Sequence, residues 1–153
     1  ETSYWLEYGN KPLYPFGYGL TYTTFEYGAV QLSDTILSIS GKPQSIIASC
    51  EITNTGHCDA VAVPQLYIRD VVGTLTRPLR ELKGFQRVNI PAGETRTVSF
   101  EISEQDLAYW HLAEGVTLGS DGEYAFSAEK GDFHVWIAPN AVERQYIPFT
   151  LVE

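Results

Sequence analysis

Apolar side chains recur at every second position along most of this chain, which is the spacing of a β-strand with one buried face. From Thr97 to Ile102 they alternate with threonine, serine and glutamate, and the stretches Tyr124–Ala128 and Phe133–Ile137 repeat the alternation. Further strands are predicted over Thr23–Leu32, Ile36–Ser40, Ser45–Thr53, Ala60–Asp70, Glu81–Ile90 and Arg144–Leu151. The pattern therefore predicts an all-β chain.

Turn-forming residues separate these strands at short intervals, for example at Ser40–Pro43, Pro91–Glu94 and Lys130–Asp132. Many short strands with such spacing are typical of an antiparallel sandwich. Only one helical turn is expected, after Ser103, because Ser103 and Asp106 have the spacing of a capping box.

The apolar positions of the strand predicted over Ala60–Asp70 change parity along its length. Its apolar positions are odd-numbered at Val61 and Val63, but even-numbered from Leu66 onward. The change falls at Pro64, which has no N–H to donate to a neighbouring strand. We therefore expect a bulge or an edge position at this proline.

The first 22 residues, here called the leader, follow neither the strand nor the helix period. Glycines and prolines interrupt a run of large apolar residues: Tyr4, Trp5, Leu6, Tyr8, Leu13, Tyr14, Phe16, Tyr18 and Leu20. Flexible linkers are rich in glycine, serine or charge, whereas this segment carries enough aromatic surface to require a partner. We predict an extended docking segment over residues 1–22 and a sandwich over residues 23–153, with Tyr14, Phe16 and Tyr18 as interdomain contacts.

Composition supports one globular domain and restricts its partners. The 153 residues suffice for a single hydrophobic core, and 44% are hydrophobic against 19% charged. The net charge of −9 opposes binding to nucleic acid or to an anionic membrane surface, so we expect neither partner. No apolar run approaches the about 18 residues that cross a bilayer, and residues 1–10 contain no signal segment.

The residue types that most often carry chemistry do not form a recognisable site. Cys50 alternates with isoleucines and is predicted to be a buried thiol, with a bridge to Cys58 as the alternative. The three histidines lack a metal-ligand spacing, so we expect no metal and no cofactor. The carboxylates between Glu101 and Asp132 fall on solvent faces, in turns or at the helix cap. The sequence predicts no catalytic residue.

Two features exceed this background. Five of the ten cationic residues fall within nineteen positions: Arg69, Arg77, Arg80, Lys83 and Arg87. One interpretation is a surface that docks an acidic neighbour or a saccharide. The other is a strand face that only contacts solvent. Trp136 is expected on the outward side of its strand, as a candidate saccharide contact or as a cover for the end of the sandwich.

Arg77, Pro78 and Glu81 are predicted to form a structured docking loop. Pro78 favours extended backbone at Arg77, and Glu81 lies four residues on, within reach of a bidentate contact. Exposed ion pairs contribute only about 0–1 kcal/mol. We therefore expect Arg77→Ala to cost little in this chain alone and more where a neighbouring domain buries the pair.

The segment from Pro12 to Phe25, PLYPFGYGLTYTTF, closely resembles the segment that opens the C-terminal fibronectin type III-like domain of family 3 glycoside hydrolases, the β-glucosidase and β-xylosidase family. The resemblance continues in the family's order through Asn54–Gly56, Val63–Asp70, Thr76–Phe85, Pro91–Thr95, Asp106–Trp110 and Gly131–Ile137. It implies an immunoglobulin-like sandwich, as the alternation does.

The resemblance also implies where the chemistry is located. By this resemblance, the aspartate nucleophile of the enzyme lies in a Ser-Asp-Trp motif on an N-terminal barrel. The acid/base carboxylate lies on the domain that partners this barrel. Here Asp34 and Asp121 are followed by Thr35 and Gly122, so neither is assigned that role. The chain itself is expected to be inactive.

The resemblance therefore implies a non-catalytic domain that stabilises the catalytic domains of a retaining, exo-acting β-glucosidase or β-xylosidase. Such an enzyme would be secreted or periplasmic, and the domain would border the aglycone side of its site. The alternative is a stand-alone module that binds carbohydrate or another surface, including oligosaccharide, through Trp136 or the cations between Arg77 and Arg87.

Overall fold

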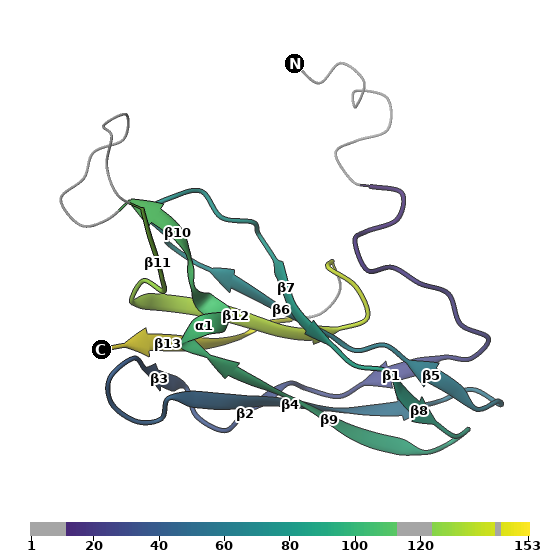
Figure 1. Ribbon diagram of the computed structural model, residues 1–153. Helices are drawn as coiled ribbons and strands as arrows, with labels where there is room; N and C mark the ends of the chain where they lie inside the picture. The colour runs from purple at the N-terminus through teal and green to yellow at the C-terminus, as the bar shows by residue number, and fades with distance from the viewer. Residues whose placement is uncertain (1–11, 113–123, 143–144) are drawn as a thin grey trace, which may run out of the picture.

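A computed structural model describes residues 12–112, 124–142 and 145–153 of the chain (Figure 1). Thirteen strands and one helical turn follow in order: β1 (Phe25–Tyr27), β2 (Gln31–Leu32), β3 (Ile36–Ser38), β4 (Ser45–Asn54), β5 (Ala60–Ala62), β6 (Gln65–Asp70), β7 (Glu81–Phe85), β8 (Val88–Ile90), β9 (Thr95–Ser103), α1 (Glu104–Leu107), β10 (Tyr109–Leu112), β11 (Tyr124–Ser127), β12 (Gly131–Ala138) and β13 (Ile147–Val152), counted within those ranges. The predicted all-β sandwich is confirmed.

Two facing sheets enclose the main core (Figure 1). One sheet has the strand order β3-β13-β12-β6-β7, and in the other β4 pairs with β1, β2 and β9. Among the strands in the described ranges, pairing is antiparallel except between β13 and β3, which are parallel. Every second residue of β4, and of β9 from Val98 onward, is buried between the sheets, as the alternation predicted. Phe133 stacks on Phe149 with ring centroids 5.4 Å apart. Cys50 is buried in this core as a thiol, as predicted, and forms no disulfide with Cys58, which is exposed.

The strands predicted over Ala60–Asp70 and Glu81–Ile90 form one long two-stranded ribbon that crosses between sheets. The register that pairs β5 with β8 continues into the pairing of β6 with β7, and a bulge follows at Leu66 and Tyr67. Between the two pairs, Gln86 N donates to Pro64 O at 3.1 Å. The predicted change of parity at Pro64 is wrong for the buried residues, because Val61 and Val63 are each 40% exposed whereas Ala62 is buried, as are Leu66 and Ile68. The bulge lies two residues beyond Pro64.

Other boundaries differ locally from the predictions. The strand predicted over Thr23–Leu32 is interrupted at Gly28, whose N–H bonds to Glu51 O at 2.7 Å. The predicted helical turn is confirmed, with Asp106 accepting hydrogen bonds from both the N–H and the hydroxyl of Ser103 at 2.8 Å. β10 was not predicted. The start of the strand predicted from Arg144 lies outside the described residues, and β13 begins at Ile147.

The turn that follows β4 is fixed by a buried amide. Asn54 Nδ2 donates to Cys58 O and Ile90 O, both at 2.8 Å. Its Oδ1 accepts from Thr23 Oγ1 at 2.6 Å and from Gly56 N at 3.1 Å. One side chain thus joins the entry to β1, the turn after β4 and the end of β8.

Candidate docking site

The described part of the leader, residues 12–22, precedes β1 and forms neither helix nor strand (Figure 1). Its large apolar side chains are all exposed, from 44% for Tyr18 to full exposure for Tyr22: Leu13, Tyr14, Phe16, Tyr18, Leu20 and Tyr22. Such a contiguous apolar surface is uncommon on a domain that works alone.

Backbone contacts hold this row of side chains in place. Phe16 O accepts a hydrogen bond from Ala141 N at 2.9 Å, and Tyr18 N donates to Pro15 O at 3.0 Å. The rings of Tyr14 and Tyr18 lie 5.1 Å apart. Since the anchoring groups belong to the main chain, the side chains remain available for another surface.

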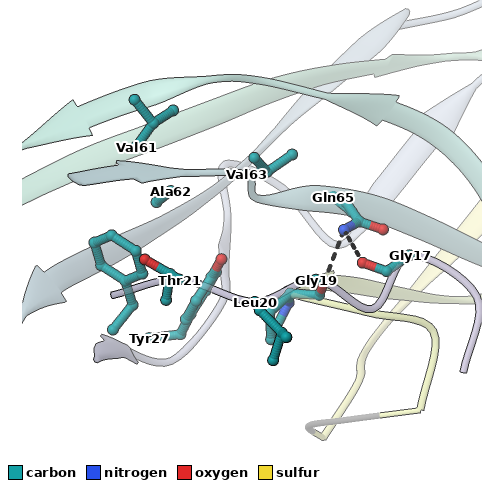
Figure 2. Close-up of a pocket in the computed structure, with 11 residues that line it drawn as sticks. Gly17, Gly19, Leu20, Thr21, Tyr27, Val61, Ala62, Val63 and Gln65 are labelled. Atoms are coloured by element: carbon teal, nitrogen blue, oxygen red, sulfur yellow. Dashed lines mark hydrogen bonds between the residues drawn. The ribbon is translucent and has the colours of Figure 1, made fainter. Parts of the chain in front are cut away.

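Gly17 and Gln65 form a close contact between the leader and the sandwich. Gln65 Nε2 donates to Gly17 O at 2.9 Å and to Pro139 O at 2.8 Å (Figure 2). Its Oε1 accepts a hydrogen bond from the Tyr67 hydroxyl. Gly17 has φ +78°, and a Cβ there would lie 2.0 Å from Gln65 Oε1. Only glycine fits both the backbone conformation and this close approach.

A cavity of about 330 Å³ lies beside this contact. Figure 2 shows Val61, Ala62 and Val63 on one side of it and Leu20, Thr21 and Tyr27 on the other. Its lining is mainly apolar, so the surface around the leader is hollowed as well as hydrophobic.

Arg77, a predicted docking residue, forms an internal junction. Its Nη2 donates to Glu81 Oε2 at 2.8 Å, and its Nη1 lies 3.8 Å from Asp70 Oδ2 and 3.4 Å from Leu107 O. Its guanidinium carbon sits 4.0 Å from the centre of the Tyr109 ring. The loop over residues 71–80 is thereby tied to both β7 and β10.

These contacts correct the energetic expectation for Arg77. The predicted contact with Glu81 is present, but through a single oxygen, because Lys83 Nζ occupies Glu81 Oε1 at 2.7 Å. The Arg77 side chain is only 11% exposed within this chain. The premise that this pair is exposed is therefore wrong for Arg77, and its burial favours a larger cost of Arg77→Ala in the chain alone. Pro78 is exposed.

A second set of polar contacts ties the same loop to the β10–β11 hairpin. Glu129 accepts hydrogen bonds from Thr74 N at 3.0 Å and Thr74 Oγ1 at 2.6 Å. The Thr74 hydroxyl also lies 3.1 Å from the Tyr109 hydroxyl. The loop, β10 and the residues after β11 thus share one hydrogen-bonded network.

Burial and hydrogen bonding act in opposite directions on the carboxylates here. Burial raises the pKa of Asp70, and the nearby Arg77 charge only partly offsets it. Burial also opposes ionisation of Glu81, but hydrogen bonds and charges from Lys83 and Arg77 outweigh it and lower the pKa. For Glu129, burial is likewise outweighed by hydrogen bonds from Thr74 and Tyr109, so its pKa is lowered.

We expect Glu129→Gln to reduce the acid sensitivity of the fold. Because the folded-state pKa of Glu129 is lowered, its contribution is fully present above the unfolded-state value of about 4.3 and is lost as the pH falls through the folded-state pKa. Urea unfolding should show that the unfolding free energy falls less between pH 7 and pH 3 for Glu129→Gln than for the wild type. Glu101→Gln, on the solvent face of β9, is the control, and an equal fall in both variants contradicts the prediction.

Trp136 lies on the face of its sheet that points away from the main core, as expected, but it is only 4% exposed. Arg80 lies over its ring, 4.2 Å from the ring centre, and Tyr146 packs edge-on at 5.7 Å. Trp136 therefore covers the outer face of the sheet together with Tyr67 and Ala138. Its predicted saccharide contact stays a prediction and would require Arg80 to move.

The cation cluster is divided among separate contacts. Arg77 and Lys83 both bind Glu81, Arg80 covers Trp136, and Arg87 is exposed between β7 and β8. These residues consequently do not form one continuous basic strip.

The sequence interpretation missed one exposed aromatic surface. Trp110 and Phe126 lie opposite each other on β10 and β11, and both rings are more than half exposed. The alternation of Tyr124 and Phe126 in the sequence predicts that both side chains face the core, whereas the structure exposes both. In the part of the chain that the structure describes, no group of three or more His, Cys, Asp and Glu side chains is placed to hold a metal ion, and no helix could span a bilayer.

The facing sheets and the crossing ribbon define an immunoglobulin-like β-sandwich domain. Residues 62–141 match the fibronectin type III-like domain family, and the chain belongs to that family, in the form present in family 3 glycoside hydrolases.

Relatives with curated sequences are larger enzymes. The chain is 37% identical to the periplasmic β-glucosidase of Salmonella typhimurium over 99% of its own length, and 37% identical to a putative β-xylosidase of Formosa agariphila over 92%. It spans only 18% and 17% of these relatives, respectively.

Solved structures show the same relation. A β-glucosidase from Erythrobacter marinus superposes with a TM-score of 0.78 at 34% identity, covering 93% of this chain and 17% of that one. A β-glucosidase from Listeria innocua, solved with laminaribiose, gives 0.77 at 27% identity over 97% of this chain and 18% of that one. Domains of this kind therefore occur within larger glycosidase chains.

Proposed function

We propose that this chain is a non-catalytic C-terminal domain of a family 3 glycoside hydrolase and stabilises its catalytic domains. The observation that carries the proposal is the leader, whose main chain is fixed to the sandwich while its apolar side chains face outward. Interfaces are enriched in such aromatic residues. More than four-fifths of the length of these relatives lies outside the part that matches this chain. The corresponding region of the parent enzyme is the surface on which the leader docks.

The parent enzyme is a retaining, exo-acting β-glucosidase or β-xylosidase that hydrolyses O-glycosyl bonds with two carboxylates outside this chain. The names of the relatives support these two substrate classes. The periplasmic relative supports a secreted or periplasmic enzyme. The sandwich provides a rigid body, and Tyr14, Phe16 and Tyr18 contact the catalytic part, together with the exposed Pro78 beside the Arg77–Glu81 junction.

We expect the triple substitution of Tyr14, Phe16 and Tyr18 by serine to lower the melting temperature and activity of the full-length enzyme. The same substitution should leave the melting temperature of the 153-residue chain nearly unchanged, since these side chains are exposed in it. Differential scanning calorimetry and an aryl β-glycoside assay measure both quantities.

Phe85→Ser provides a control, because Phe85 is equally exposed but lies at the end of β7, outside the leader. An unchanged melting temperature and activity of the triple variant in the full-length enzyme would contradict the docking role.

A further inference from the structure

The outward face of the β10–β11 hairpin is an aromatic platform of Trp110, Phe126 and Tyr124. Trp110 and Phe126 face each other across the two strands with ring centroids 5.4 Å apart and planes inclined by 51°. Tyr124 lies two residues from Phe126 along β11, so it shares this face at a spacing of about 7 Å. The three side chains are 65%, 55% and 63% exposed, respectively.

Contacts on the opposite face of the hairpin hold the platform in position. Tyr109 lies beneath the guanidinium of Arg77 and beside the Thr74 hydroxyl. His111 Nε2 lies 2.8 Å from Ser127 Oγ, which joins the two strands through their side chains. Because this support already fixes the backbone beneath the rings, little conformational entropy is lost when a ligand stacks on them.

The chemistry of the platform matches that of a neutral sugar. The C–H groups on one face of a pyranose ring carry partial positive charge and are attracted to the negative face of an aromatic ring, while the hydroxyls at the ring edge stay in water. The net charge of −9 disfavours polyanions. The leader, in contrast, mixes leucines with its aromatic residues, as protein contact surfaces do.

We propose that Trp110, Phe126 and Tyr124 form a binding platform for neutral polysaccharides with exposed pyranose faces. Trp110 and Phe126 stack on one sugar unit, and Tyr124 contacts the next and offers its hydroxyl as a hydrogen-bonding group. This goes beyond the proposed function, because the platform works whether or not the leader docks on catalytic domains. It also places saccharide binding on the hairpin and not on Trp136.

Affinity electrophoresis of the 153-residue chain in native gels tests the proposal. Barley β-glucan, laminarin and xylan serve as neutral probes, and polygalacturonate serves as the anionic control. We expect at least one neutral polymer to retard the wild-type chain, with at least tenfold weaker binding for Trp110→Ala and for Phe126→Ala. Phe85→Ala, which removes an exposed aromatic ring at the end of β7, should bind like the wild type. Circular dichroism checks that every variant is folded.

Three results would overturn the proposal. The first is the absence of retardation by any of the neutral polymers. The second is equal binding by the wild type and Trp110→Ala. The third is concentration-dependent self-association in gel filtration that Trp110→Ala abolishes while the polymers have no effect, which would make the platform a protein contact. A negative result with the Tyr14, Phe16 and Tyr18 triple variant would not change any of these three results. The docking role of the leader and the saccharide-binding role of the platform are therefore tested separately.

Discussion

Asn54→Ala should lower the free energy of unfolding of this chain by about 2–4 kcal/mol. The substitution removes both donors that satisfy Cys58 O and Ile90 O, and the acceptor of the Thr23 hydroxyl and Gly56 N–H. Asn54 is fully buried, and each buried polar group left without a partner costs about 1–3 kcal/mol. Water that enters the gap left by the amide would offset part of this loss.

Urea unfolding monitored by fluorescence and circular dichroism measures the change. Asn89→Ala is the matched control, because Asn89 is the same residue type at an exposed position of β8, one residue before Ile90. We expect the control to change the unfolding free energy by less than about 0.5 kcal/mol. Equal effects of the two substitutions would show that the Asn54 hydrogen bonds do not hold the turn.

Arg77→Ala should destabilise the isolated chain by about 2–4 kcal/mol, because it leaves the buried Asp70 carboxylate without its cationic partner. It also removes a hydrogen bond to Glu81 and the stacking on Tyr109. Asp70→Asn in the Arg77→Ala background should restore part of the loss, since it removes the uncompensated charge. Arg96→Ala breaks an ion pair with Glu94 that is about half exposed, and should cost only about 0–1 kcal/mol.

The deficit of Arg77→Ala should narrow between pH 7 and pH 4. Burial already raises the folded-state pKa of Asp70, and loss of Arg77 raises it further. A carboxyl group with a raised folded-state pKa binds its proton more tightly in the folded chain, so protonation stabilises the variant as the pH falls through that pKa. Unfolding free energies at the two pH values measure this. A deficit that stays constant, or a loss no greater than that of Arg96→Ala, contradicts the buried junction.

The strands could be predicted from sequence where polar and apolar residues alternate regularly. β4 and β9 have such an alternation, and both were predicted to within two residues at each end. β10 was missed because Tyr109–Leu112 consists of three aromatic or imidazole side chains and a leucine, without a polar face. The capping box of α1 was predicted because both of its partners lie within one turn of chain.

The candidate sites depend on contacts between distant residues, which sequence periodicity does not contain. Arg77 was predicted to be exposed, but Leu107 and Tyr109 contact it and help to bury it. Both lie about thirty residues further along the chain, so the sequence around Arg77 does not indicate this contact. Trp136 was correctly placed on the outer face, but its cover by Arg80 comes from a loop between two other strands. The docking role of the leader was suggested by composition and resemblance, whereas its anchoring through Gln65 emerged only from the fold.

The ribbon that crosses between the sheets limits where this domain tolerates changes in length. Because its two strands keep one register through Pro64 and Gln86, inserting a single residue on either side of the crossing would exchange the inward and outward side chains of one strand beyond that point. An insertion there would need a matching insertion in the opposite strand. The loop over residues 71–80 closes the ribbon outside the paired strands. Insertions and deletions among related domains should therefore concentrate in that loop, before Arg77, because the contact between Arg77 and Glu81 requires their four-residue spacing.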